Sequence, residues 1–259
     1  MIAKKCLGQN FLQNPHILDQ IVNALDLNPG DRILEVGPGP AFLSRKIIPK
    51  VTSYFAIEID HQFQGILESL EKEFTNFHYV IDDFLHVPIR TFSSCNKFVG
   101  NLPYHISTPI LYRIATQTDI AMLVCMFAIG TAERFLSSHH SPNYSAASVM
   151  AQSFFSVEKV MIVPKTQFVP SPKVDSMILR FIRKPVNQQV MIDFSEWVQP
   201  LFSFRRKTIM NSLIQCKISK EFAIHILNSC QINLTERVEN IPLDKLFELY
   251  QKHQNKETE

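Results

Sequence analysis

The sequence has no long apolar run and no large excess of either charge. No stretch of its 259 residues approaches the roughly 18 consecutive apolar residues of a membrane-spanning helix. The opening MIAKKCLGQNFL lacks the apolar core of a secretory signal peptide. The formal net charge of +2 is too small to identify a nucleic-acid partner by itself. We therefore expect a cytoplasmic protein that recognises its partners through local clusters of charge.

Cysteine is also scarce, and it follows no pattern. The chain has five cysteines, an odd number, and neither CxxC spacing nor histidine pairs accompany them. A disulfide framework and a zinc site both require more regular spacing. We therefore expect no disulfide framework and no bound metal.

Short apolar runs alternate with segments of helical spacing over most of the chain. Asn14 and Pro15 match an N-cap and a first helical residue, and apolar residues at helical spacing follow them. The runs RILEV, SYFAIEI, FHYVI, KFVGN, IAMLVCMF and VEKVMIVP have the composition of strands, as does the segment 174–182. Strands that alternate with helices predict a mostly parallel, doubly wound α/β sheet.

The strand pattern stops after Lys184 and Pro185. From Phe194 onward the apolar residues recur at helical spacing. We therefore expect an α/β domain over residues 1–185 and a smaller helical domain over residues 186–259. The candidate core positions of the helical domain are Trp197, Leu201, Ile209, Leu213, Phe222, Ile226, Leu246 and Leu249.

The stretch VGNLPYHISTPI combines an amide, a rigid turn and an aromatic ring. Asn101 offers a side-chain carbonyl as an acceptor, and Pro103 fixes its own φ and favours an extended Leu102. Tyr104 supplies a flat aromatic face. An exocyclic amine would donate to the Asn101 amide oxygen and to the Leu102 carbonyl while its ring stacks on Tyr104. The string therefore predicts a binding device for a planar nitrogen heterocycle.

The same string is also an ordinary way to leave a strand and enter a helix. In that interpretation Ser107 is the N-cap and Pro109 lies in the first helical turn. The two interpretations stay open on these residues alone.

A glycine turn lies between the expected strand RILEV and the following helix. Gly37 and Gly39 allow a ligand to approach the backbone at the carboxyl edge of the sheet, and the helix N-terminus favours an anionic group. A dinucleotide fold continues to a third glycine in GxGxxG, whereas Pro40, Ala41 and Phe42 follow here. The turn is therefore a poor match to the dinucleotide-binding motif.

Acidic residues end the next two expected strands. Glu58 lies 21 residues beyond Gly37, where a carboxylate accepts hydrogen bonds from both hydroxyls of a ribose. Asp82 and Asp83 follow the third strand, and Asp83 is placed to accept from an adenine amine. Helix capping and simple turn formation are the alternative roles. The common location at successive strand ends favours an adenosine-type ligand.

The ordered motifs of the chain resemble those of the KsgA/RsmA family of small-subunit rRNA adenine dimethyltransferases. The resemblance implies a Rossmann-like class I S-adenosylmethionine-dependent methyltransferase domain with a small C-terminal helical domain. It also implies the transfer of two methyl groups to each of two adjacent adenines near the rRNA 3′ end, in a small-subunit precursor particle, by a monomer. The motifs are GQNFL (8–12), EVGPG (35–39), AIEID (56–60), Asp83, NLPYHISTP (101–109), FVPSPKVDS (168–176) and FRRKTIMNSL (204–213).

The resemblance also implies a set of site residues and a mechanism without a metal or a strong base. The target adenine leaves its stack, and Phe168 grips it on the face opposite Tyr104; packing in the core is the alternative role of Phe168. The implied catalytic residues are Asn101, Leu102, Pro103, Tyr104 and Phe168. The implied cofactor-binding residues are Gln9, Asn10, Leu12, Gly37, Gly39, Glu58, Ile59, Asp83, Phe84 and Asn101.

The chain departs from the family pattern at three places. Ala41 stands where the family has a glycine, His105 follows NLPY in place of an asparagine, and AIGTAER (128–134) replaces a QKE-like string. The last is nearer to the erythromycin-resistance methylases, which modify large-subunit rRNA and share the first several motifs. FVPSPKVDS and FRRKTIMNSL favour the small-subunit branch. A third hypothesis is an RNA-binding assembly or transcription factor that retains the fold without methyl transfer.

The densest basic run is Arg205, Arg206 and Lys207. Three consecutive residues span about 200° of a helix, so at least two of these side chains face solvent or phosphate. No acid lies within four residues on either side, which disfavours intrahelical ion pairs. We expect this run to contact ribosomal RNA.

Overall fold

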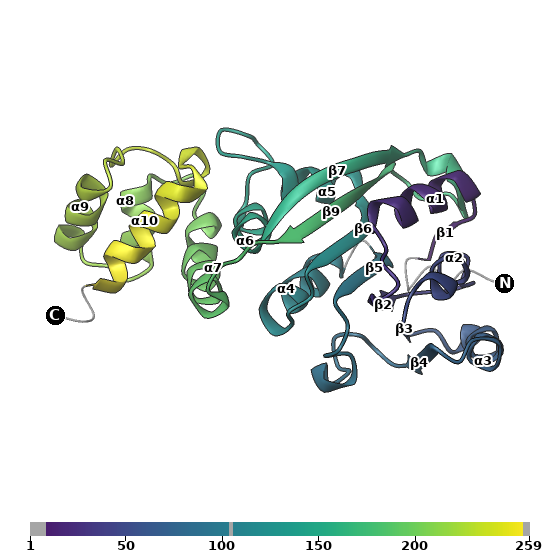
Figure 1. Cartoon of the computed structure of the whole chain (residues 1–259). Coiled ribbons are helices and arrows are strands. Elements are labelled where there is room, and N and C mark those ends of the chain that lie inside the picture. The colour runs from purple at the N-terminus through teal and green to yellow at the C-terminus, as the bar shows by residue number, and fades with distance from the viewer. Residues whose placement is uncertain (1–8, 104–105, 256–259) are drawn as a thin grey trace. The chain divides into compact units, whose positions relative to one another are not determined.

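The computed structural model describes residues 9–103 and 106–255, and it divides into two compact units (Figure 1). The first unit falls within residues 1–132 and 155–183, and the second within residues 133–154 and 184–259. Residues 133–154 therefore belong to the second unit, whereas the sequence analysis placed them in the first domain, over residues 1–185. Hydrogen bonds explain the difference, since the His140 amide donates to the Glu239 carbonyl (3.0 Å) and the Arg205 guanidinium to the Pro142 carbonyl (3.2 Å).

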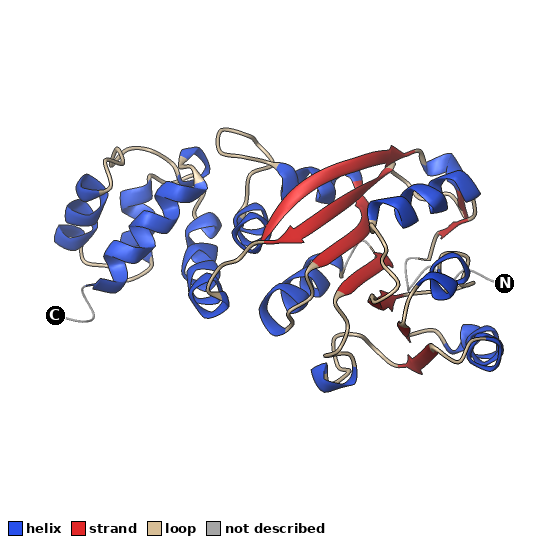
Figure 2. Ribbon diagram, in the orientation of Figure 1, coloured by secondary structure: helices blue, strands red, loops and turns tan. Residues whose placement is uncertain are grey.

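The first unit contains a seven-stranded sheet of mixed direction (Figure 2). Its strands in spatial order are β4 (Phe77–Ile81), β3 (Ser53–Glu58), β2 (Arg32–Val36), β5 (Lys97–Asn101), β6 (Met122–Ala128), β9 (Ser176–Arg183) and β7 (Phe155–Val163). The first five run parallel, and β9 is antiparallel to both its neighbours. The mostly parallel α/β fold is thus confirmed. The order reverses between β2 and β5, and such a switch point opens a crevice at the strand ends.

A separate two-stranded ribbon joins the start of the chain to a much later segment. It pairs β1 (Phe11–Leu12) with β8 (Phe168–Val169) in antiparallel register. The ribbon holds the N-terminal residues beside the end of β2, where the glycine turn begins.

Two helices of the first unit had a capping residue predicted from the sequence, and the structure bears out one of them. Asn14 caps α1 (Pro15–Ala24), since its side chain accepts from the His16 amide at 2.9 Å. Ser107 is not the N-cap of α4 (Ser107–Gln117), because Ile106 occupies that position and its carbonyl already accepts from Ile110. The other helices are α2 (Ser44–Ile47), η2 (Ile48–Lys50), η3 (His61–Phe63), α3 (Gln64–Glu73), η4 (Ile89–Thr91), η5 (Lys165–Gln167) and α5 (Ile129–Leu136), which crosses into the second unit.

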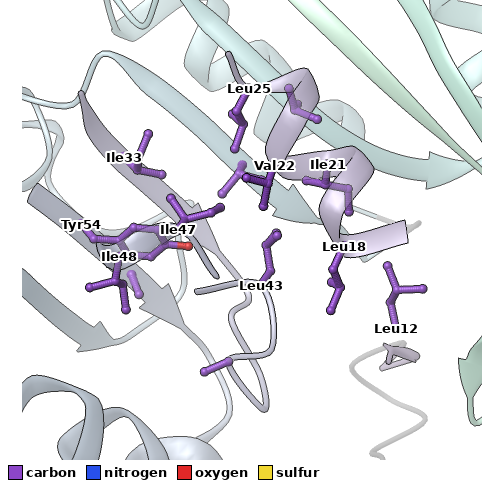
Figure 3. Close-up of a cluster of buried hydrophobic side chains, with 14 of the residues drawn as sticks. Leu12, Leu18, Ile21, Val22, Leu25, Ile33, Leu43, Ile47, Ile48 and Tyr54 are labelled. Atoms are coloured by element: carbon purple, nitrogen blue, oxygen red, sulfur yellow. The ribbon is translucent and has the colours of Figure 1, made fainter. Parts of the chain in front are cut away.

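Both faces of the sheet are buried at its central strands. One face packs its alternate residues, such as Ile33 and Tyr54, against a cluster that includes Leu18 and Val22 of α1 (Figure 3). The intervening residues Leu34, Phe98 and Leu123 are fully buried as well. Burial on both faces explains why the strands have continuous apolar runs instead of a polar alternation.

The second unit is helical. Asn187, Thr208 and Ser219 each cap a helix by accepting from a backbone amide. The expected core positions are buried, except that Trp197 and Phe222 are half-buried. Its helices are α6 (Ala146–Phe154), α7 (Gln188–Ser203), α8 (Ile209–Gln215), α9 (Lys220–Ser229), η6 (Val238–Asn240) and α10 (Leu243–Gln254). Within the described residues, no helix has both the length and the apolar character to cross a membrane.

A buried ion pair fixes the start of β5, the strand that ends at Asn101. Lys97 Nζ lies 2.8 Å from the Asp31 carboxylate, and it also donates to the Leu25 and Asp26 carbonyls at the end of α1. Burial raises the pKa of Asp31, but its hydrogen bonds, led by that from Lys97, outweigh burial and leave the pKa below its ordinary value. The pair therefore joins α1 to the central strand of the switch point.

We expect Lys97→Met to lower the free energy of unfolding by about 3 to 5 kcal/mol at pH 7, because Asp31 stays buried without its cation. The depressed pKa makes the contribution of the pair present above about pH 4 and lost as the pH falls through the folded-state pKa. Urea titrations of wild type and variant at pH 7 and well below pH 4 should therefore converge at the lower pH. Lys46→Met is the control, since its pair with Asp19 is partly exposed and should contribute at most about 1 kcal/mol. Equal losses in the two variants would contradict this prediction.

Candidate functional site

A cavity lies at the carboxyl ends of the parallel strands, and it gathers most of the expected site residues. Residues of the first unit alone line it. The lining residues are Gln9, Asn10, Phe11, Val36, Gly37, Gly39, Ile57, Glu58, Ile59, Phe63, Asp82, Asp83, Phe84, Asn101, Leu102, Pro103 and Ile106.

The glycine turn after β2 forms the floor of this cavity. Gly37 and Gly39 have φ of 74° and 52°, in the left-handed region that favours glycine. The Gly37 amide donates to the Ile57 carbonyl and the Gly39 amide to the Glu58 carboxylate, both at 2.9 Å. Ala41 also has a positive φ, of 62°, and a fully buried methyl group. The substitution of the family glycine at this position thus keeps the turn at a conformational cost of about 1 kcal/mol.

Glu58 presents a buried carboxylate at the end of β3. Its side chain is 4% exposed; Oε1 accepts from the Asp60 amide and Oε2 from the Gly39 amide, each at 2.9 Å. Burial raises the pKa of Glu58, and these hydrogen bonds oppose the rise. Each carboxylate oxygen keeps one further lone pair, so the group is able to accept from two neighbouring hydroxyls.

The segment before β1 is tied to the cavity wall. Gln9 Nε2 donates to Asp60 Oδ2 at 2.7 Å, and Asn101 Nδ2 donates to the Asn10 carbonyl at 3.0 Å. The second bond fixes the orientation of the Asn101 amide, and it leaves Oδ1 as an acceptor without a partner in the described part of the chain. Gln9 and Asn10 are therefore part of the site and not a free tail.

The loop after β4 offers both a donor and an acceptor. Asp83 Oδ1 accepts from the Leu85 amide at 2.9 Å, while the carboxylate is 31% exposed. The Phe84 amide N–H has no acceptor among the described residues. An adenine edge presents the matching pair, an amine donor beside a ring-nitrogen acceptor.

Two expected residues lie apart from this cavity. Leu12 and Phe168 pair across the β1–β8 ribbon, and both side chains are buried in the hydrophobic cluster. The alternation of a strand instead directs Phe11 into the cavity, where its ring meets that of Phe63 edge to face at 5.6 Å. The sequence analysis left out Phe11, which period-2 alternation next to a buried Leu12 would have indicated. Tyr104 and His105 lie outside the described residues, so stacking on Tyr104 or Phe168 stays a prediction.

A second cavity lies behind the glycine turn and contains Glu35, another residue that the sequence analysis did not single out. The Glu35 carboxylate accepts from Tyr54 Oη at 2.6 Å and from Ser44 Oγ, and burial raises its pKa to about 7. Leu12 borders this cavity, which shares Phe11 and the glycine turn with the first. Among the described residues, no cluster of His, Cys, Asp or Glu suits a metal ion.

The basic run of the second unit lies in a turn between α7 and α8 and not in a helix. Arg205 Nε donates to Glu239 at 2.7 Å, so an acid from outside the local sequence pairs with this residue. The partner is 34 positions away in the sequence and escapes a local search. Arg206 and Lys207 are exposed, with Lys207 Nζ 5.4 Å from the Phe204 ring centre.

Comparison with known proteins identifies the family. Residues 2–255 match the model of the family described as ribosomal RNA adenine dimethylase. "Ribosomal RNA small subunit methyltransferase A" of Persephonella marina is 33% identical over 96% of this chain and 93% of its own. A solved dimethyladenosine transferase from Plasmodium falciparum is 25% identical, with a TM-score of 0.82 over 95% of this chain and 98% of its own.

A solved 23S rRNA methyltransferase, ErmE, shares the fold with a TM-score of 0.72 at 24% identity, over 94% of this chain and 99% of its own. The structural likeness extends to the whole class I methyltransferase architecture, and the match to the family model extends over nearly every residue. The chain therefore belongs to the ribosomal RNA adenine dimethylase family, whose members are S-adenosylmethionine-dependent enzymes.

Proposed function

We propose that this protein dimethylates the exocyclic amines of two adjacent adenines near the 3′ end of small-subunit rRNA, and that the cavity at the switch point is its cofactor site. The observation that carries the proposal is the convergence of Glu58, Asp83 and Asn101 on one cavity from the ends of three strands. The names of the similar relatives support the small subunit. The same proposal includes a monomer that acts in the cytoplasm on a precursor particle.

The residues present fit S-adenosylmethionine. Glu58 has two lone pairs left for the ribose hydroxyls. The free Phe84 amide N–H suits a ring nitrogen of adenine, and Asp83 Oδ2, which also lies 3.5 Å from His86 Nδ1, suits its amine. Gly39 keeps the floor open, since a Cβ there would lie 3.4 Å from the Phe11 ring and fill the approach. We therefore assign adenosine recognition to these residues.

The chain's own contribution to the chemistry is the placement of hydrogen-bond acceptors. When bound, S-adenosylmethionine supplies a methyl group that its sulfonium already activates. The adenine amine is a weak nucleophile because its lone pair is delocalised into the ring. Asn101 Oδ1, held in orientation by the Asn10 carbonyl, accepts one N–H, and the Leu102 carbonyl accepts the other. Acceptors outside the ring plane favour a tetrahedral nitrogen, so positioning replaces a strong base.

The large-subunit alternative rests on AIGTAER at residues 128–134. The intact Glu58, Asp83 and Asn101 argue against a factor that has lost methyl transfer. Labelled S-adenosylmethionine, offered to small and large subunits that lack adenine dimethylation and followed by mapping of the labelled nucleotide, separates the three hypotheses. Label in adjacent adenines of small-subunit rRNA supports our proposal; label only in the large subunit, or none, overturns it.

Asn101→Ala should lower the single-turnover rate of methyl transfer by about 10² or more on saturating RNA, because the reacting amine loses an oriented acceptor. Cofactor affinity should change little, since the ribose and adenine partners are intact. Rapid quench with labelled cofactor measures the rate, and calorimetry measures the affinity. A rate within a few fold of wild type would show that Asn101 does not act on the amine.

Glu58→Ala should weaken S-adenosylmethionine binding by roughly 1.5 to 3 kcal/mol or more, because two hydroxyls lose a charged acceptor. Calorimetric titration of the folded variant measures the change. Glu73→Ala, which removes a half-exposed carboxylate on α3, is the control. Unchanged affinity in Glu58→Ala would remove this residue from the site.

Arg206→Gln with Lys207→Gln should flatten the salt dependence of rRNA binding by about one to two units in the slope of log K against log salt concentration. Arg205 is left in place, because its pair with Glu239 serves the fold of the second unit. Lys217→Gln with Lys220→Gln removes the same charge from exposed positions elsewhere in this unit and is the control. Equal slopes for both double variants would place the RNA footprint elsewhere.

A further inference from the structure

Arg113 is a buried cation on α4, and its guanidinium binds the backbone of a loop, with the charge of Asp83 acting on it from beyond ion-pair distance. The side chain is 8% exposed, and no carboxylate of the described residues lies within ion-pair distance. Its two terminal nitrogens donate to the carbonyls of Phe84 and Val87, and Nε donates to Gln117 at 3.3 Å. A buried charge is costly unless hydrogen bonds satisfy it, so this arrangement requires the loop to present its carbonyls in one conformation.

The guanidinium also holds the aromatic rings of the same loop. Its carbon lies 5.1 Å from the centre of the Phe84 ring and 5.9 Å from that of Phe92, and the two rings are 5.5 Å apart. A planar cation on an aromatic face is favourable when both are desolvated. Arg113 thus fixes Phe84 twice, through its carbonyl and through its ring.

The loop that Arg113 fixes is a wall of the cofactor cavity. Asp83 and Phe84 line that cavity, and so do Pro103 and Ile106, of which Ile106 directly precedes α4. Arg113 lies about two turns into α4. It therefore connects the helix that follows the catalytic loop to the loop assigned to adenine.

We propose that Arg113 is a positioning residue for cofactor recognition, which holds the Phe84 amide and the Asp83 carboxylate in the orientation that an adenine edge requires. The inference rests on the proposed placement of adenine against these two residues. Arg113 touches neither the cofactor nor the reacting amine.

The chain offers a matched control in Arg183. This arginine donates to the carbonyls of Ile114, Ala115 and Ile120 at 2.8 to 3.0 Å and lies 4.9 Å from the Phe155 ring centre. It makes the same kind of contact with carbonyls of the same helix that directly follow Arg113, and none of these residues lines the cofactor cavity. A general loss of stability should be common to variants of both arginines, whereas a loss of cofactor recognition should be confined to Arg113.

The test compares Arg113→Met, Arg113→Lys, Arg183→Met and Asp83→Ala in the full chain. Calorimetry measures the affinity for S-adenosylhomocysteine, thermal unfolding measures stability, and steady-state assays give KM for S-adenosylmethionine and kcat. We expect Arg113→Met to weaken binding and to raise KM by about tenfold or more, with kcat within about threefold of wild type. Arg113→Lys keeps the charge but not the planar guanidinium, so its affinity should lie between those of wild type and Arg113→Met. Arg183→Met should lower the melting temperature similarly and change affinity less than about twofold.

The outcomes separate the two proposals. If Asp83→Ala binds as tightly as wild type, the placement of adenine is wrong and the inference fails with it. If Asp83→Ala weakens binding and both Arg113 variants do not, only the positioning role is wrong. If Arg113→Met and Arg183→Met weaken binding equally, Arg113 acts through stability alone, which also overturns the proposal. If Arg113→Met does not fold, the affinity of Arg113→Lys against Arg183→Met decides in the same way.

Discussion

The reversal of strand order between β2 and β5 is the constraint on which the rest of the molecule depends. From β2 the chain proceeds outward to β3 and β4, and from β5 it proceeds the other way to β6. The loops after β2 and β5 therefore leave the sheet edge in opposite directions and cannot cover the gap between them. The glycine turn forms one side of the opening and Asn101 the other, so topology alone brings the proposed cofactor site and the proposed catalytic amide together.

Three ionisable groups near this opening are buried, and polar groups rather than opposite charges balance them. Glu58 accepts from two amides, and Arg113 donates to two carbonyls. Glu35 accepts from two hydroxyls, and burial raises its pKa to about 7 although these hydrogen bonds oppose the rise. Backbone partners of this kind are available only at loops and strand ends, which explains why these charges gather at the carboxyl edge of the sheet.

Local pattern was sufficient where the physical cause is local. The alternating runs, the Asn14 cap and the glycine turn each depend on a few neighbouring residues, and the sheet with its switch point follows from them. Contacts between residues far apart in the sequence could not be predicted from local pattern. The ion pair between Arg205 and Glu239 is an example, because nothing in the residues around either one indicates the other. The same holds for residues 133–154, whose place in the helical unit depends on hydrogen bonds to segments that are distant in the sequence, such as that between Pro142 and Arg205, 63 positions apart. Strand alternation alone places Phe11 rather than Leu12 in the cavity, but a two-residue strand is too short for the alternation to be recognised in the sequence.

The N-terminal ribbon also sets the order in which the site is completed as the chain is made. Gln9 donates to Asp60, and the Asn10 carbonyl accepts from Asn101. Strand β1 pairs with β8, which begins only at Phe168. Each interaction therefore forms only after the later residue has been synthesised. Such distant pairings form late in folding, because the intervening chain must first be ordered. The residues that leave the ribosome first are thus among the last to reach their partners. A chain synthesised only as far as β6 already contains the glycine turn, Glu58 and Asp83. It still lacks β8, the strand that pairs with β1 and holds it beside the amide of Asn101.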